Sequence, residues 1–392
     1  MSGRDLFCQP RRFGRGAALT LVFAGVLVAG AATGSLPDGD HPDTSGRKAA
    51  QAAARTGTRH DDVEKAAADA MADGKSPMEA AERAVSRSGD RWGAVYSEGE
   101  YQEFQEALDG EYTGVGLWAR RERNGRIEVT RVQSRSPAAA AGIRKGDRLR
   151  SVDGHRVDGR PITEVVALLR GDAQDAPAGT TVRLGLERGT RAWSETLRRA
   201  RLSTDSVTVR RLPDGVTVIR IAAFTKGSGD DVRAAVRQVP ADGGIVLDLR
   251  GNSGGLVSEA TTAASAFLDG GLVATYDVDG KQRALHAESG GDTARPLVTL
   301  VDGGTMSAAE MLTGALQDRG RAVVIGSRTF GKGSVQMPSK LPDGSVAELT
   351  VGHYRTPAGR AVDGRGITPD LEAGQDALQR AETVLSGLGD PS

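Results

Sequence analysis

The second half of the chain constrains the fold most, because short apolar runs alternate there with helical stretches. The runs are rich in β-branched residues and do not alternate with polar ones; they are Val216–Ile221, Gly244–Leu249, Leu297–Val301 and Ala322–Ile325. The stretches between them repeat apolar residues at helical spacing and comprise Asp230–Val239, Leu256–Leu268 and Ser307–Gln317. Such strands, separated by helices, predict an α/β fold with a largely parallel sheet covered on both faces.

One stretch of this half carries a serine and a lysine in settings that suit catalysis. Ser307 stands at the predicted start of a helix, and Lys332 lies between Gly331 and Gly333 in a loop. A serine hydroxyl is a weak nucleophile until a base takes its proton, and a lysine kept neutral by desolvation is one such base. Arginine cannot serve, and the chain uses 43 arginines but only 8 lysines. The helix N-terminus adds unpaired N–H groups that suit an oxyanion.

Other interpretations of both residues stay open at this point. Ser307 and Glu310 fit a capping box, in which the two side chains satisfy backbone donors and do no chemistry. Lys332 could be an exposed loop lysine. Gly326–Lys332 also fits the start of a phosphate loop, but Gly333 stands where that motif needs Ser or Thr.

The block SAAEMLTGALQDRGRAVVIGSRTFGKGSVQ resembles the catalytic core of the carboxyl-terminal processing proteases, also called tail-specific proteases. Their pattern runs S-A-S-E and then, after a helix and a strand, F-G-K-G-[ST]-V-Q. The resemblance implies a crotonase-like α/β core, with Ser307 as nucleophile, Lys332 as general base and Gln336 orienting the lysine. The chain departs from the pattern at Ala309 and Met306, neither of which is the nucleophile.

A second block, DLRGNSGG at 248–255, follows a predicted strand and precedes a helix, where open α/β sheets bind ligands. It resembles the family's D-L-R-x-N-x-G-G block, whose glycine backbone contributes to the oxyanion hole. The resemblance implies this role for Gly254 or Gly255, together with the N–H of Ala308. Asp248 and Arg250 are expected to brace the loop, because charges at strand ends usually form structural pairs.

Residues 112–201 resemble a PDZ domain, on the string SPAAAAGIRKGDRLRSVDG and the order of predicted elements around it. The resemblance implies that a loop captures the terminal carboxylate of a peptide, which then joins the adjacent strand edge. The expected peptide-binding residues are Gly114, Val115, Gly116 and Leu117. The motif Gly366–Asp370 resembles the family's closing G-I-x-P-D, so we expect a catalytic core over 202–373 and a short C-terminal helix and tail over 374–392.

The N-terminal part carries targeting signals. Residues 1–34 combine a basic start with an uncharged apolar run, which predicts either a cleaved signal peptide or an uncleaved membrane anchor. The flanking arginines should remain cytoplasmic, so the rest of the chain is expected outside the cytoplasm. Residues 35–60 read as a flexible linker and 61–111 as a helical region.

Composition narrows the function further. The formal net charge is zero, which does not suggest nucleic acid, and no His, Cys or Asp cluster has metal-ligand spacing, so neither a metal nor a cofactor is expected. The only cysteine, Cys8, excludes a disulfide within the chain. We therefore expect an extracytoplasmic serine endopeptidase that binds substrates by their exposed C-termini. The alternative is a catalytically inactive PDZ scaffold that binds C-terminal peptides, and the sequence favours no oligomeric state.

Overall fold

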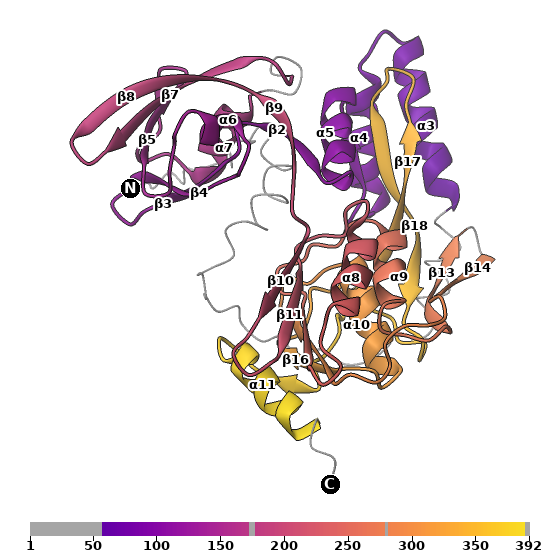
Figure 1. The fold of residues 1–392 in the computed structure, drawn as a ribbon. Helices are drawn as coiled ribbons and strands as arrows, with labels where there is room; N and C mark the ends of the chain where they lie inside the picture. Colours follow the sequence, from indigo (N-terminus) through magenta and orange to yellow (C-terminus); the bar gives the residue numbers. More distant parts are fainter. Residues whose placement is uncertain (1–56, 172–176, 279–280, 389–392) are drawn as a thin grey trace, which may run out of the picture. The chain divides into compact units, whose positions relative to one another are not determined.

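The computed structural model describes residues 57–171, 177–278 and 281–388, which form two compact units (Figure 1). Residues 113–202 make up one unit and the remaining described residues the other. The predicted targeting segment, 1–34, lies outside the described residues. Most of the predicted linker does too, but its last four residues, 57–60, are wrongly placed there, because helix α3 begins at Gly57. No helix within the described ranges has the length and apolar character needed to cross a bilayer.

The unit inserted at 113–202 is a β-rich module with two helices. Its elements are β2 (Glu111–Gly114), β3 (Leu117–Arg121), β4 (Ile127–Val132), α6 (Pro137–Ala140), β5 (Arg148–Val152), β6 (His155–Arg156), α7 (Ile162–Arg170), β7 (Thr181–Arg188), β8 (Arg191–Arg198) and β9 (Ala200–Ser203). The main sheet is antiparallel with the order β3-β4-β5-β7-β8, and β2 pairs with β9. Alternate residues of β4 and β7, such as Val129 and Leu184, are buried in one core with Val165 of α7. This arrangement confirms the predicted module.

The larger unit surrounds the insertion in sequence. Before it come α3 (Gly57–Ala72), α4 (Pro77–Ser88), β1 (Ala94–Tyr96) and α5 (Glu98–Leu108). After it come β10 (Val207–Arg211), β11 (Thr217–Ile221), α8 (Ser228–Arg237), β12 (Ile245–Asp248), α9 (Val257–Ala264), β13 (Leu272–Val278), β14 (Lys281–His286), β15 (Leu297–Val301), α10 (Ala308–Asp318), β16 (Val323–Gly326), β17 (Ser334–Lys340), β18 (Val346–Arg355), β19 (Leu371–Glu372) and α11 (Ala377–Leu388).

The central sheet of this unit is parallel except at one edge. Its order is β10-β11-β12-β15-β16-β19, and only β10 runs antiparallel to its neighbour. Because side chains alternate across a strand, Ile219 and Leu247 pack on one face with helices α8, α9 and α10, whereas Val218 and Val246 pack on the other with α11. The predicted α/β fold with both faces covered is confirmed (Figure 1).

A second, antiparallel sheet was not predicted from the sequence. It has the order β1-β18-β13-β14, and β17 pairs with β18 along its length. Strand β1 lies between α4 and α5, so the prediction of a helical region over 61–111 is wrong at Ala94–Tyr96. This short strand forms because β18 supplies its hydrogen-bonding partners, with Ala94 opposite Glu348, and no local pattern reveals such a distant partner.

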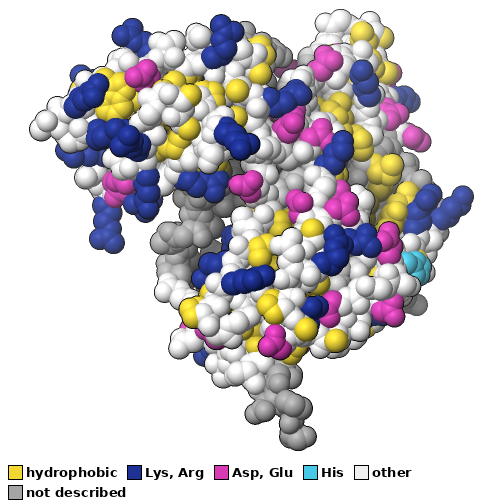
Figure 2. Space-filling model, in the orientation of Figure 1, with side chains coloured by type: hydrophobic (Ala, Val, Ile, Leu, Met, Phe, Trp, Pro, Cys, Tyr) yellow, Lys and Arg dark blue, Asp and Glu magenta, His cyan; other side chains and the backbone are white. Residues whose placement is uncertain are grey.

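The zero net charge conceals an uneven distribution. Residues 113–202 hold 19 Lys and Arg but only 10 Asp and Glu, so this unit carries a net charge of +9 and the rest of the chain −9. Basic side chains, dark blue in Figure 2, gather over the strands of the inserted unit. An anionic group is therefore attracted to this unit, whatever the charge of the whole chain.

The packing of α11 on the second face of the sheet can be tested with a cavity-forming substitution. Leu385 is 4% exposed and lies in the core cluster with Val246 and Ile325. We expect Leu385→Ala to lower the free energy of unfolding of the larger unit by about 2–5 kcal/mol. Thr383, exposed on the same helix, is the control: Thr383→Ala should change that free energy by no more than about 0.5 kcal/mol. Chemical denaturation followed by circular dichroism measures both, and equal midpoints would contradict this packing.

Candidate active site

Ser307 occupies a strained turn between β15 and α10. Its backbone has φ +52° and ψ −117°, a region that residues with a side chain seldom adopt. Among the described residues, three other serines begin helices with extended backbones and accept a hydrogen bond from the N–H three residues on; they are Ser76, Ser97 and Ser136. Ser307 forms the capping box with Glu310 that the sequence allowed, but it lacks the backbone geometry of an ordinary cap, and strain of this kind is concentrated at functional sites.

Glu310 ties the Ser307 turn to the Lys332 loop. Its buried carboxylate accepts the Ser307 N–H at 2.9 Å and the Lys332 N–H at 2.8 Å on one oxygen. The other oxygen accepts the Gly331 N–H at 2.7 Å and the Thr329 hydroxyl at 2.5 Å. Burial raises the pKa of Glu310, although these four donors oppose the shift. The backbones of the two predicted catalytic residues are thus joined through one carboxylate.

Tyr354 makes a second link between the same two segments. Its hydroxyl donates to the Ser307 carbonyl at 2.9 Å and lies 3.3 Å from the Lys332 carbonyl. Burial raises the pKa of Tyr354 well above its ordinary value, so the hydroxyl keeps its proton and remains a donor. Tyr354 comes from β18, in the sheet that was not predicted, and no sequence motif had singled it out.

The Lys332 side chain is largely enclosed. Its Nζ lies 5.4 Å from the centroid of the Trp92 ring. Burial lowers the pKa of Lys332, and the carboxylates of Glu348 and Asp90 partly oppose this shift. An amine in this setting loses its proton more readily than an exposed lysine, which is what a general base requires.

Gln336, expected to orient the lysine, has a different hydrogen-bonding partner. Its side-chain nitrogen donates to the carbonyl of Trp92, and among the described residues no hydrogen bond joins it to Lys332. Gln336 is thus linked to the surroundings of the Lys332 amine through Trp92, a residue that the sequence analysis had not selected. The scarcity of tryptophan, with three in the chain, is the one sequence signal that could have drawn attention to it.

A cavity of about 220 Å³ opens beside Ser307. Most of its wall is apolar or aromatic, and the residues that line it with Ser307 are Val257, Tyr276, Leu285, Ala308, Met311, Ser334, Val335, Gln336 and Tyr354. Met306 and Ala309, where the chain departs from the family pattern, do not line this cavity and so do not reduce its volume. Ala309 is buried in the core, and the Met306 N–H donates to the Asn252 carbonyl at 2.8 Å.

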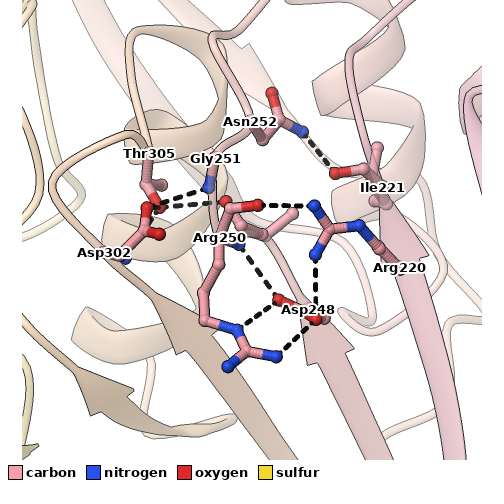
Figure 3. A network of polar contacts seen from close by, with 9 residues as sticks. Arg220, Ile221, Asp248, Arg250, Gly251, Asn252, Asp302 and Thr305 are labelled. Atoms are coloured by element: carbon pink, nitrogen blue, oxygen red, sulfur yellow. Dashed lines mark hydrogen bonds and ion pairs between the residues drawn. The ribbon is translucent and has the colours of Figure 1, made fainter. Parts of the chain in front are cut away.

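Ion pairs at the end of β12 stabilise the loop at 248–255. Figure 3 shows the Asp248 carboxylate between the guanidinium groups of Arg220, at 3.1 Å, and Arg250, at 2.8 Å. Although burial acts in the opposite direction, Arg250 and Arg220 lower the pKa of Asp248 overall. The loop is also tied to the turn before Ser307, because the Gly251 N–H donates to Asp302 at 2.8 Å.

Asn252 distinguishes between the two glycines considered for the oxyanion hole. Its side-chain nitrogen donates to the Ile221 carbonyl at 3.0 Å (Figure 3). Its side-chain oxygen accepts the Gly254 N–H at 2.8 Å. Gly254 must be a glycine because a Cβ there would lie 2.9 Å from that of Ser307, but its N–H is already occupied. The N–H groups of Gly255 and Ala308, by contrast, make no hydrogen bond with any described residue.

The predicted peptide-binding loop lies in the inserted unit, at the start of β3. Gly116 has φ +78°, and a Cβ there would come within 2.2 Å of Ser136. The Val115 side chain is buried in the core of this unit and the carbonyls of Val115 and Gly116 accept backbone hydrogen bonds. Their N–H groups have no hydrogen-bonding partner in the described part of the chain. Two donors at the edge of the sheet therefore remain available.

Comparison with known proteins identifies the family of the chain. Residues 215–373 match the profile of peptidase family S41, and residues 128–188 match that of a PDZ domain. A CtpA-like serine protease of Staphylococcus saprophyticus is 33% identical over 78% of this chain and 63% of its own length. The carboxy-terminal-processing protease of Bartonella bacilliformis is 32% identical over 74% of this chain and 68% of its own length. The chain thus spans somewhat less than two thirds of the staphylococcal relative.

A solved structure supports the fold independently. A protein of Bacteroides fragilis assigned to the S41 proteases superposes with a TM-score of 0.54 at 19% identity, over 81% of this chain and 91% of that one. The two profiles match the two units described above, in the same order along the chain. The chain therefore belongs to peptidase family S41, among the PDZ-containing carboxy-terminal processing proteases.

Proposed function

We propose that the protein is a serine endopeptidase in which Ser307 is the nucleophile and Lys332 its general base. The observation that carries this proposal is the Glu310 carboxylate, which accepts the backbone N–H of both residues while Ser307 faces an apolar cavity. The lowered pKa of Lys332 and the strained backbone of Ser307 support it further.

The reaction follows from these roles. The neutral Lys332 amine takes the hydroxyl proton as the Ser307 Oγ attacks the carbonyl carbon of the substrate. The negative charge that develops on the carbonyl oxygen is met by the N–H groups of Ala308 and Gly255. The C–N bond then breaks, Lys332 returns the proton to the leaving amine, and water hydrolyses the remaining ester. Gly254 supports the turn sterically, since its own N–H is held by Asn252.

We further propose that the inserted unit captures substrates by their C-termini. The N–H groups of Val115 and Gly116 would bind the terminal carboxylate, and the net positive charge of the unit would attract it. Strand β3 lies at an edge of its sheet, so the last residues of a substrate can pair with it as an added strand. The substrate class is thus protein or peptide chains with exposed C-termini.

The proposed location is outside the cytoplasm. The basic start and apolar run of residues 1–34 support it, either as an anchor that holds the protein at the membrane or as a signal that is removed to release it. Mass spectrometry of the mature N-terminus distinguishes anchoring from release.

The central test replaces the two reacting side chains. Ser307→Ala and Lys332→Ala should each reduce kcat for an unstructured, C-terminally apolar protein substrate about a thousandfold or more. Ser258→Ala and Lys340→Ala, at exposed positions, are the matched controls and should retain wild-type activity. Undiminished cleavage by Ser307→Ala would refute the role of Ser307 as nucleophile. If the wild-type protein binds C-terminal peptides but cleaves nothing, the alternative of a catalytically inactive PDZ scaffold is favoured.

The bridging role of Glu310 predicts a larger loss than its position outside the cavity suggests. Glu310→Gln keeps the size of the side chain but points an N–H₂ group at backbone donors, which leaves buried groups unpaired at about 1–3 kcal/mol each. We expect kcat to fall about tenfold or more and the melting temperature to drop. Glu79→Gln, an exposed carboxylate on α4, should change neither. Kinetics and thermal denaturation measure both effects. Wild-type kcat and melting temperature for Glu310→Gln would show that the hydrogen bonds of Glu310 do not support the site.

The pH dependence of acylation has a predicted direction. Activity should fall as the pH drops through the lowered pKa of Lys332, because the ammonium cannot accept a proton. The Glu348 carboxylate stabilises that ammonium, so Glu348→Gln should lower the pKa of Lys332 further and move the acid limb of the kcat/KM profile to lower pH. A limb that stays in place, or one that moves to higher pH, would contradict this electrostatic coupling.

A further inference from the structure

A short turn of the N-terminal segment is built into the lysine site. Residues 89–93 connect α4 to β1, and Asp90 accepts the N–H groups of Trp92 at 3.0 Å and Gly93 at 2.9 Å. The same carboxylate accepts the backbone N–H and the hydroxyl of Thr350, both at 2.8 Å. The turn is therefore closed internally and fastened to β18, the strand that also carries Tyr354 and Glu348.

The Trp92 residue on this turn is held at both ends. Its carbonyl accepts the side-chain nitrogen of Gln336, and its indole N–H donates to Asp363 at 3.3 Å. Asp363 also accepts the Gly333 N–H at 3.2 Å, so the ring is linked to the residue directly after Lys332. The ring of Phe330 lies 5.7 Å away at an interplanar angle of 55°. The indole is thus fixed beside the loop of Phe330–Gly333.

We propose that Trp92 is a positioning residue, whose ring covers Lys332, keeps water from its amine and limits its side chain to conformations that reach Ser307. This inference rests on the proposed role of Lys332 as base. A lysine side chain has four rotatable bonds, so without a wall it would spend much of its time away from the serine. The wall comes from a segment that precedes the inserted unit in sequence, and the S41 profile, which begins at residue 215, does not include it.

The charged groups around the Lys332 amine determine how its pKa would change if the amine became more exposed to water. Glu348 of β18 and Asp90 of the turn face it and favour the ammonium, whereas burial favours the neutral amine and has the larger effect. Glu310 accepts the backbone N–H of Lys332, Asp363 accepts the indole N–H, and the Arg91 guanidinium lies 4.6 Å from the Trp92 ring. At 5.4 Å the ring is near the limit of about 6 Å for cation–π attraction, so its main effect is to exclude water. Loss of the ring should therefore raise the pKa of Lys332.

The test compares variants of Trp92 in the full chain. Trp92→Ala should lower kcat about tenfold or more, change KM much less, and move the acid limb of the kcat/KM profile to higher pH. Trp92→Phe keeps an aromatic wall without the indole N–H and should recover most of kcat and the original limb. The matched control is Trp193→Ala: this tryptophan of β8 also lies near arginine side chains, but it belongs to the inserted unit. Trp193→Ala should leave the acid limb of the kcat/KM profile unchanged.

A second measurement does not depend on catalysis. The rate at which acetic anhydride modifies Lys332 at a series of pH values, followed by peptide mass spectrometry, reports the pKa of that amine directly. We expect the midpoint to shift upward in Trp92→Ala and to remain near the wild-type value in Trp92→Phe. If Trp92→Ala does not fold, Trp92→Leu, which keeps an apolar side chain, replaces it in both assays and should show a smaller shift in the same direction.

The outcomes separate this inference from the proposed function. An unchanged limb, kcat and labelling midpoint in Trp92→Ala would overturn the role of Trp92, even if Lys332→Ala is inactive. Full activity of Lys332→Ala would instead overturn the role of Lys332 as base. A loss of activity in Trp92→Ala with an unshifted labelling midpoint would also contradict the inference, because a merely structural residue would behave in that way.

Discussion

The candidate active site depends on one buried carboxylate. Glu310 accepts hydrogen bonds from the Ser307 turn and from the Lys332 loop, two segments that are separated by α10 and β16 along the chain. A buried carboxylate with four donors is a demanding arrangement, since an unpaired charge at this depth would be unfavourable by several kcal/mol. The need to pair this carboxylate also fixes the positions of the two segments, because all four donors reach Glu310 when the Ser307 turn and the Lys332 loop lie side by side.

The parallel sheet explains why two separate motifs meet. Strands β12 and β15 are parallel neighbours, with Asp248 opposite Leu300, so their carboxyl ends lie at the same edge of the sheet. The loop that follows β12 carries Gly254 and Gly255, and the turn that follows β15 carries Ser307. Asn252 joins them, because its carbonyl accepts the Met306 N–H at 2.8 Å. Ligand sites in open α/β sheets lie at this edge, and here the same edge carries the proposed nucleophile and the proposed oxyanion donors.

Much of this architecture could be predicted from the sequence because it follows from local patterns. Apolar runs of Val, Ile and Leu predict buried strands, and the runs at 217–221, 245–248 and 297–301 lie within the predicted ranges. The order of the two units along the chain was equally accessible, since each has a specific motif. What these features share is that the residues which determine them are close together in sequence.

The parts that could not be predicted depend on distant partners. Strand β1 exists because β18 pairs with it, and Trp92 faces Lys332 because Asp90 binds Thr350. The choice between Gly254 and Gly255 required knowing where the Asn252 side chain points, which the DLRGNSGG block alone does not reveal. Neither helical nor strand periodicity contains information about such contacts.

The distance in sequence between Asp90 and Thr350, 260 residues, has a consequence for biosynthesis. A chain that is synthesised from its N-terminus cannot close this contact until residue 350 has been made. Contacts of such high order form late in folding, after the inserted unit has had time to fold by itself. The effect that we propose for Trp92 on Lys332 therefore begins only after β18 has been made and has paired with the N-terminal turn.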